Sequence, residues 1–233
     1  MATKITWLGH SGVQIQLESG EVILIDPWTS GPTFPAEHEF DRVDLLLITH
    51  GHFDHIANAV EIAEKHKPQV VAIFETAAWL GSKGVENITG MNKGGSCELL
   101  GCRVTLTHAQ HSNSIQDGDQ TVYGGEAAGF VVKLPDGRSL YHAGDTNVFS
   151  DMQLIRRLYS PELAMLPIGD LYTMDPREAA IAAEFIQAAK VLPLHYGTFP
   201  PLVGTPSALR DLLGEAGVSA EVLEPQPGET ISW

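Results

Sequence analysis

The residues best suited to chemistry are concentrated in one short stretch, HGHFDH, at positions 50–55. It follows directly on an apolar run at positions 43–48 that carries no charge after Asp44. Such a run is typical of a strand buried on both faces of a sheet. Residues two apart in an extended chain project to the same side, so His50 and His52 can bind one metal ion.

The second half of this motif adds a carboxylate and a third imidazole. Asp54 and His55 lie where the chain is expected to turn from the strand into a helix, within reach of a second ion. Imidazole nitrogens combined with a carboxylate oxygen suit zinc, iron or manganese. We therefore expect a metal site at the end of this strand.

Further candidate ligands follow later apolar runs, each at the point where the run stops. Loops at strand ends carry chemistry because the sheet holds them rigidly while they remain accessible. Together the candidates supply enough nitrogen and oxygen donors for two ions, with one carboxylate that can bridge. The predicted metal ligands are His50, His52, Asp54, His55, His111, Asp145 and His195.

A pair of metal ions suggests a reaction class. Two ions ~3.5–4 Å apart can share a water molecule and lower its pKa to ~7, which provides hydroxide at neutral pH. That hydroxide could attack an electrophilic carbonyl carbon or phosphorus.

His10, in a glycine-flanked loop at a strand end, is a candidate for substrate contact or proton donation. The alternative is a histidine that only stabilises the turn. Asp54 is a second candidate catalytic residue, as a general base rather than a ligand, although the adjacent His55 favours metal binding.

Composition limits the kinds of partner. The 233 residues, 43% of them hydrophobic, can bury a substantial core. A formal charge of −15 argues against a non-specific nucleic-acid binder, so we expect a small-molecule substrate. No apolar segment approaches the ~20 residues that span a bilayer, and no signal sequence is recognisable, so we expect no membrane partner and a cytoplasmic location. A homo-oligomer is left open.

The order of the elements indicates an α/β fold. Strands come first, and strands then alternate with helices in both halves, which suits two sheets covered by helices. A polar, glycine-containing stretch at 113–125 is expected to be a mobile loop. Strands are expected at 3–8, 13–18, 21–26, 43–48, 69–74, 97–106, 129–134, 139–141, 163–167 and 191–194, with two short ones in 220–233. Helices are expected at 55–66, 75–80, 151–159, 175–190 and 205–217.

These motifs resemble the metallo-β-lactamase superfamily. The matching segments are HGHFDH at 50–55, HS at 111–112, AGDT at 143–146 and LHYGTFP at 194–200. Within the superfamily, WLGHSG at 7–12 and TMDP at 173–176 are similar to metal-dependent hydrolases related to L-ascorbate-6-phosphate lactonase. The chain departs from that group at 170–172, where the relatives have a glycine-rich step.

The resemblance implies a four-layer αββα sandwich, the metallo-β-lactamase fold, formed by one domain over residues 1–233. It also implies a centre of two metal ions. By the same resemblance, one ion is held by His50, His52, His111 and Asp145, and the other by Asp54, His55, Asp145 and His195.

The sequence as a whole predicts a metal-dependent hydrolase. Hydroxide bound to the two metal ions would cleave a small ester-like substrate, a lactone or a phosphoester. Zinc or manganese is expected, with iron or nickel as alternatives. Two other functions use the same residues: an iron-dependent oxidoreductase, and a metal-binding protein without turnover.

Overall fold

The computed structural model describes residues 2–233, which fall into two compact units. Unit 1 consists of the chain up to Gly95 together with Ser112–Ala127 and Pro225–Trp233. Unit 2 consists of Ser96–His111 and Ala128–Glu224. Each unit contains one seven-stranded sheet, and the expected α/β class is confirmed in both. The single domain expected over residues 1–233 stays a prediction.

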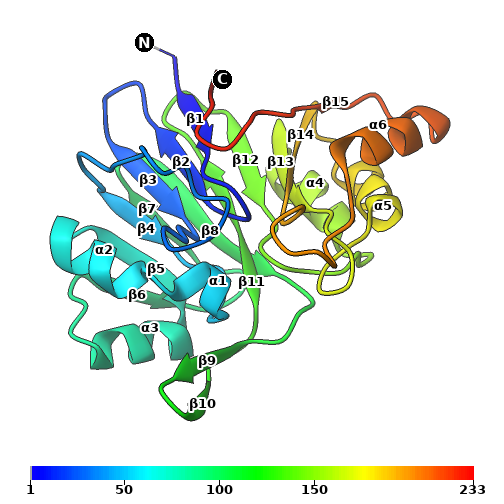
Figure 1. The fold of residues 1–233 in the computed structure, drawn as a ribbon. Helices are drawn as coiled ribbons and strands as arrows, with labels where there is room; N and C mark the ends of the chain where they lie inside the picture. Colours follow the sequence, from blue (N-terminus) through cyan, green and yellow to red (C-terminus); the bar gives the residue numbers. More distant parts are fainter. Residues whose placement is uncertain (1) are drawn as a thin grey trace. The chain divides into compact units, whose positions relative to one another are not determined.

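The sheet of unit 1 has the strand order β16-β1-β2-β3-β4-β5-β6 (Figure 1). β16 to β3 pair antiparallel, and β3 to β6 pair parallel. The strands are β1 (Lys4–Trp7), β2 (Val13–Gln16), β3 (Val22–Ile25), β4 (Leu45–Leu47), β5 (Gln69–Ile73), β6 (Ile88–Met91) and β16 (Thr230–Ser232). Because β16 pairs with β1, the first and last strands of the chain lie side by side.

Three helices pack on one face of this sheet (Figure 1). They are α1 (Phe53–Ile56), α2 (Ala59–His66) and α3 (Phe74–Ser82). Ile62 of α2 and Leu80 of α3 join Leu24, Leu46 and Val70 of the strands in one buried cluster. The alternate residues of β3 and β4 are also buried, so these strands are apolar on both faces, as expected for a parallel sheet.

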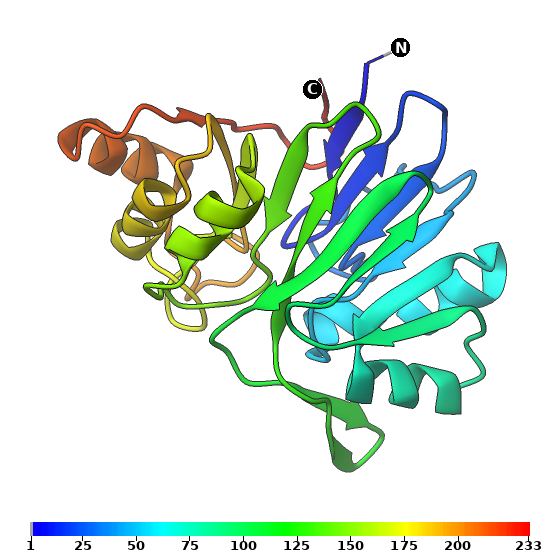
Figure 2. The same ribbon diagram turned by 180° about the vertical axis from the view of Figure 1, so that it is seen from behind.

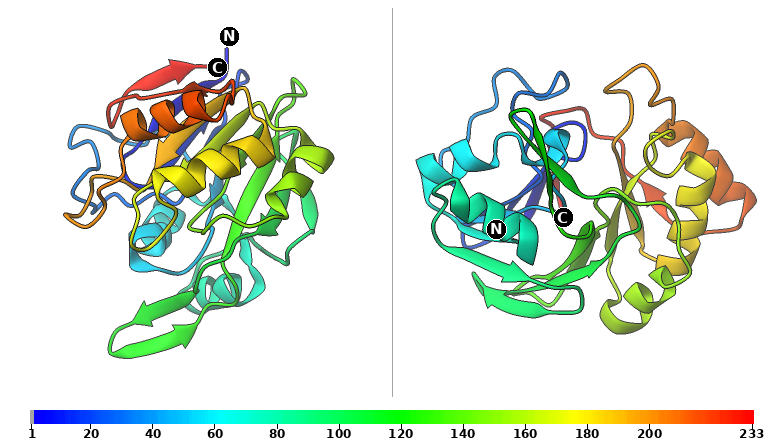
Figure 3. Two further views of the ribbon diagram at one scale, coloured as in Figure 1. Left: turned by 90° about the vertical axis from the view of Figure 1, so that its right-hand side faces the viewer. Right: turned by 90° about the horizontal axis from the view of Figure 1, so that it is seen from below.

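The expectation of a mobile loop at 113–125 was wrong. β9 (Ser114–Asp117) and β10 (Gln120–Tyr123) form an antiparallel hairpin that projects as a two-stranded ribbon (Figure 3). Its turn consists of Gly118 and Asp119, a two-residue turn with glycine at φ 59°, and this pair favours a hairpin. Ile115 is buried against the glycine between two histidines of the metal motif, and this contact anchors the ribbon.

The sheet of unit 2 has the order β15-β14-β13-β12-β11-β8-β7. β12 to β15 run parallel to one another, so the carboxyl ends of β12, β13 and β14 lie at one edge. The strands are β7 (Ser96–Leu99), β8 (Cys102–His108), β11 (Ala128–Lys133), β12 (Ser139–His142), β13 (Leu163–Pro167), β14 (Lys190–Leu194) and β15 (Glu221–Val222).

The helices of unit 2 are α4 (Met152–Tyr159), α5 (Pro176–Ile186) and α6 (Pro206–Glu215). They cover one face of its sheet (Figure 2), where alanines of α5 pack in the core cluster. The predicted start of α5 is confirmed, because the Asp175 carboxylate accepts the N–H of Glu178 at 2.8 Å. The helix ends before the predicted Lys190, since Gln187 adopts a left-handed conformation.

Two further expectations differ from the structure. The helix expected over 55–66 is split into α1 and α2, and the break is at Asn58, whose side chain accepts the N–H and hydroxyl of Ser30. Strand β6 was not expected, because its sequence contains a glycine and lacks a clear apolar alternation. No helix within residues 2–233 is long and apolar enough to cross a membrane.

Candidate metal centre

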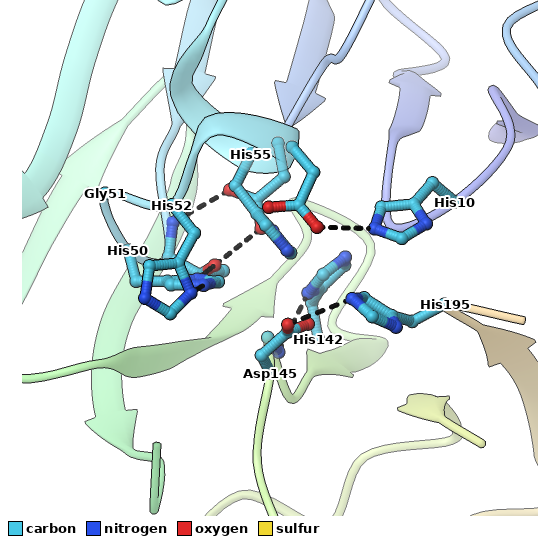
Figure 4. A network of polar contacts seen from close by, with 12 residues as sticks. His10, His50, Gly51, His52, His55, His142, Asp145 and His195 are labelled. Atoms are coloured by element: carbon cyan, nitrogen blue, oxygen red, sulfur yellow. Dashed lines mark hydrogen bonds and ion pairs between the residues drawn. The ribbon is translucent and has the colours of Figure 1, made fainter. Parts of the chain in front are cut away.

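Unit 1 brings four predicted ligands together in the segment that follows β4. The chain stays extended through His52, and α1 begins at Phe53, so its first turn carries Asp54 and His55. Nε2 of His50 and Nδ1 of His52 lie 3.0 Å apart (Figure 4). This is close to the separation of two nitrogens bound ~2.0–2.1 Å from one ion. The rings of His50 and His55 are 4.1 Å apart between centroids.

Asp26, a buried carboxylate that the sequence reasoning missed, orients two of these histidines. It lies directly after β3 and accepts the N–H of Thr49 (2.8 Å), the hydroxyl of Thr49 (2.5 Å) and the Nδ1–H of His55 (2.8 Å). The Thr49 hydroxyl in turn accepts the Nδ1–H of His50 at 3.0 Å. Both histidines therefore carry their lone pair on Nε2, the form in which imidazole binds a metal through that atom.

Asp26 itself lies close enough to these rings to be a ligand, since one donor atom from each of Asp26, His50 and His55 falls within 4.8 Å of the others. Its two oxygens already accept three hydrogen bonds, however. We therefore interpret Asp26 as a residue that positions the ligands. An aspartate at the end of an apolar strand was the signal available in the sequence.

His10 is held against Asp54. It lies in the turn after β1 with a left-handed φ of 48° and is only 1% exposed. Its Nε2–H donates to Oδ2 of Asp54 at 3.0 Å (Figure 4). The ring packs edge-on against Trp28 at 5.4 Å, and the indole of Trp7 donates to the backbone oxygen of His10 at 3.0 Å. The structure thus gives His10 a defined partner within the predicted ligand set.

A second supporting residue missed in the sequence is Asn113. Its Oδ1 accepts the N–H of Gly51, between His50 and His52, at 2.7 Å. Its amide donates to the carbonyl oxygen of Gly124 at 2.7 Å. Gly51 has no room for a side chain, because a Cβ there would collide with Ile115. The backbone between the two histidines is therefore fixed from one side.

Unit 2 brings together the other three predicted ligands. Asp145 follows β12, His195 follows β14, and His111 follows β8. Oδ2 of Asp145 lies 3.1 Å from Nε2 of His195 and 3.7 Å from Nε2 of His111. His142 shapes the turn before Asp145, because its Nδ1 accepts the N–H of Gly144 at 3.1 Å (Figure 4). One carboxylate oxygen thus lies within reach of two imidazoles, which suits shared coordination of a cation.

Tyr196 and His108 lie close in sequence to two predicted ligands of unit 2, His195 and His111. Burial raises the pKa of Tyr196 to about 12, and the charge of Glu224 adds to the shift, so the phenol remains protonated at neutral pH. His108, at the end of β8, is exposed and packs on Phe149 with ring centroids 5.0 Å apart. None of the clusters of possible metal ligands found within residues 2–233 includes His108.

The donors fit a divalent metal ion. Each unit presents imidazole nitrogens together with a carboxylate oxygen, and in unit 1 the Nδ1 atoms of two histidines are held by a hydrogen-bond network. A carboxylate that orients a histidine in this way is the usual support of a metal-binding imidazole. The residues are therefore suited to zinc, manganese or iron rather than to calcium or magnesium, which prefer oxygen ligands.

Comparisons with known proteins agree with this chemistry. Residues 21–196 match the family model described as "Beta-lactamase superfamily domain". A "UPF0173 metal-dependent hydrolase" of Solibacter usitatus is 55% identical over 231 residues, covering 99% of this chain and 100% of the relative. A protein with the same description from Methanopyrus kandleri is 44% identical over 229 residues, covering 97% of this chain and 98% of the relative.

Solved structures show the same fold. Igni18 of Ignicoccus hospitalis, described as a novel metallo hydrolase, is 35% identical with a TM-score of 0.87, covering 100% of this chain and 99% of the other. The metallo-β-lactamase fold protein YhfI of Bacillus subtilis has a TM-score of 0.72 at 15% identity, with full coverage of both chains. The predicted fold is thereby confirmed. The chain belongs to the β-lactamase superfamily domain family and is a metal-dependent hydrolase of the metallo-β-lactamase superfamily.

Proposed function

We propose that the protein hydrolyses a small ester-like substrate, a lactone or a phosphoester, with two divalent metal ions, zinc or manganese. The ions would be held by His50, His52, Asp54, His55, His111, Asp145 and His195. Bound metal ions of this kind lower the pKa of water and polarise the substrate oxygen. The observation that carries the proposal is the network in which Asp26 and Thr49 hold the Nδ1–H groups of two predicted ligands.

The side chains have distinct tasks in this proposal. Asp26 and Asn113 fix the ligand segment of unit 1 before any ion binds, so little ordering is left for the binding step. His10 donates its ring N–H to Asp54, which holds the carboxylate in position. The 3.0 Å contact also allows a proton to pass between ring and carboxylate, and we assign proton transfer to this pair.

The test combines metal analysis with a substrate panel. Protein purified without added metal, and then loaded with zinc or manganese, is assayed for metal content and for hydrolysis of lactones, phosphodiesters and β-lactams. We expect two ions per chain and hydrolysis with zinc, which has no redox chemistry. Activity that requires iron and oxygen would instead support an oxidoreductase, and tightly bound metal without turnover would support a binding protein.

A further inference from the structure

The loop after β13, residues 168–174, lies beside two predicted metal ligands of unit 2. In the sheet, β13 is hydrogen-bonded to β12 on one side and to β14 on the other, and all three run parallel. Their carboxyl ends meet at one edge, where open parallel sheets bind ligands. Figure 1 shows β13 between β12 and β14. Asp145 follows β12 and His195 follows β14, so the loop after β13 leaves the sheet between the segments that carry these two residues.

Both ends of this loop are attached to the backbone next to those ligands. Gly169 lies so close to the carbonyl oxygen of His195 that a Cβ at this position would collide with it. At the other end, the N–H of Met174 donates to the carbonyl oxygen of Thr146, the residue after Asp145, at 3.1 Å. The centre of the loop is therefore held close to both ligands.

The centre of the loop adopts a conformation that most residues avoid. Asp170 and Leu171 are consecutive non-glycine residues with positive φ, 72° and 52°. The Asp170 carboxylate accepts the N–H of Leu171 at 2.7 Å, which offsets part of the strain. Backbone strain of this kind persists where the surrounding structure enforces it, and it is found preferentially at functional sites.

This conformation exposes two large apolar side chains at the centre of the loop. Leu171 is 61% exposed and Tyr172 is 57% exposed. Val203, on the loop after β14, is 66% exposed, and the preceding Leu202 packs against Gly169. The Thr173 hydroxyl oxygen is buried and has no hydrogen-bond partner among residues 2–233. Exposed apolar groups beside polar catalytic groups are typical of a substrate-binding surface.

The charges around the loop favour a neutral ligand. Burial raises the pKa of Glu178, and the nearby carboxylates of Asp175 and Asp170 raise it further, while Arg177 partly opposes them. Three carboxyl groups and one guanidinium thus lie close to one another behind the loop. An anionic group lying over the loop would be repelled by this net negative charge, whereas an alkyl chain there would not.

We propose that Leu171 and Tyr172 determine substrate specificity by contacting an uncharged alkyl or aryl group of the substrate. The inference rests on the proposed hydrolase function, whose reacting bond would lie at the metal ligands while the apolar group extends over the loop. It narrows the substrate class to esters or lactones that carry such a group.

The test compares two carboxylates, acetate and octanoate, as probes of the zinc-loaded protein. Their dissociation constants are measured by isothermal titration calorimetry for the wild type, for Leu171→Gly with Tyr172→Ala, and for the control Leu158→Ala. Glycine at 171 accepts the positive φ, so the loop should keep its shape. Leu158 lies on α4 and is 64% exposed, which matches the exposure of Leu171.

We expect the wild type and Leu158→Ala to bind octanoate at least tenfold more tightly than acetate, because even one methylene in an apolar site changes selectivity by about tenfold or more. The double variant should lose about tenfold in affinity for octanoate relative to acetate. Equal affinities in the wild type, or a preference retained in the double variant, would overturn the inference.

The same proteins are assayed with p-nitrophenyl acetate and p-nitrophenyl octanoate. The double variant should show a raised KM for the octanoate ester and a reduced preference for it in kcat/KM. If the wild type cleaves neither ester but shows the octanoate preference in binding, the specificity surface stands and the proposed ester hydrolysis fails. The two conclusions are thus tested separately.

Discussion

Replacing Asp26 with asparagine tests whether hydrogen bonding prepares the ligands for metal. The substitution keeps the shape of the side chain but exchanges one acceptor oxygen for a donating amide. If the remaining oxygen stays on the N–H of Thr49, the new NH₂ faces the Thr49 hydroxyl and Nδ1 of His55. Nδ1 of His55 can then no longer donate, so its proton moves to Nε2, which is the nitrogen needed by the metal.

The size of the effect follows from the three hydrogen bonds that the fully buried carboxylate accepts. Hydrogen bonds to a charged group contribute ~1.5–3 kcal/mol each, and two of the three are lost, so Asp26→Asn should lower the free energy of unfolding by about 3–6 kcal/mol. Loss of a hydrogen bond that orients a ligand typically weakens metal binding by about 10- to 100-fold.

The measurement uses urea unfolding of the metal-depleted protein and competition of zinc with a chromophoric chelator. Asp44→Asn is the matched control, because Asp44 also accepts a backbone N–H, that of Val22 at 2.8 Å, but at the opposite end of β4. The control should bind zinc as the wild type does. If Asp26→Asn loses stability yet also binds zinc normally, Asp26 is a structural residue only, and the reasoning about the imidazole protons is refuted.

Four further substitutions test the site and the β9–β10 hairpin. Asn113→Ala should weaken zinc binding about tenfold by releasing the backbone between His50 and His52, measured by the same competition, and unchanged affinity would contradict this. His52→Ala should remove most of the bound metal and nearly all turnover, whereas the exposed His108→Ala should affect neither; similar behaviour of the two would refute the ligand assignment. Lys83 and Trp79 donate hydrogen bonds to the Asp117 carboxylate, and these bonds, that of Lys83 first, lower its pKa. The two bonds anchor the hairpin to α3. Their stabilisation is fully present above the ordinary carboxyl pKa of about 4 and is lost as the pH falls through the lowered pKa of Asp117. The protection of the amides of residues 114–123 against hydrogen exchange, relative to the intrinsic exchange rate at each pH, should therefore fall in acid and, at neutral pH, in Asp117→Asn. Identical protection in the variant would contradict the anchor.

The sequence was informative about the candidate ligands because metal-binding chemistry restricts the residue types that can serve. Few residue types bind a transition metal, and the i, i+2 spacing of His50 and His52 has one simple explanation in an extended chain. The apolar runs before Asp145 and His195 also placed these residues correctly at strand ends. For such positions, residue type and local sequence pattern together are sufficient to predict a place at the end of a strand.

The supporting residues could not be predicted in the same way. Asp26 and Asn113 act through hydrogen bonds to segments 23 and 62 residues away, and any acceptor at the right place could perform that task. Their positions depend on the parallel pairing of β3 with β4 and on the β9–β10 hairpin. The hairpin was missed because its polar, glycine-containing sequence is also typical of a loop.

The loop after β13 shows how strand order adds information that spacing lacks. In the sequence, Leu171 is 26 positions after Asp145 and 24 before His195, and nothing local relates the three. Once β13 is known to lie between β12 and β14, the loop must emerge between those two ligands, whatever residues it contains. Its composition is then free to vary with the substrate, while the predicted ligands would be fixed by the metal. We therefore expect proteins with this ligand set to differ in substrate specificity mainly through segments placed like residues 169–173. The comparison of acetate with octanoate tests directly whether this segment, rather than the predicted ligands, sets the preference for an alkyl chain.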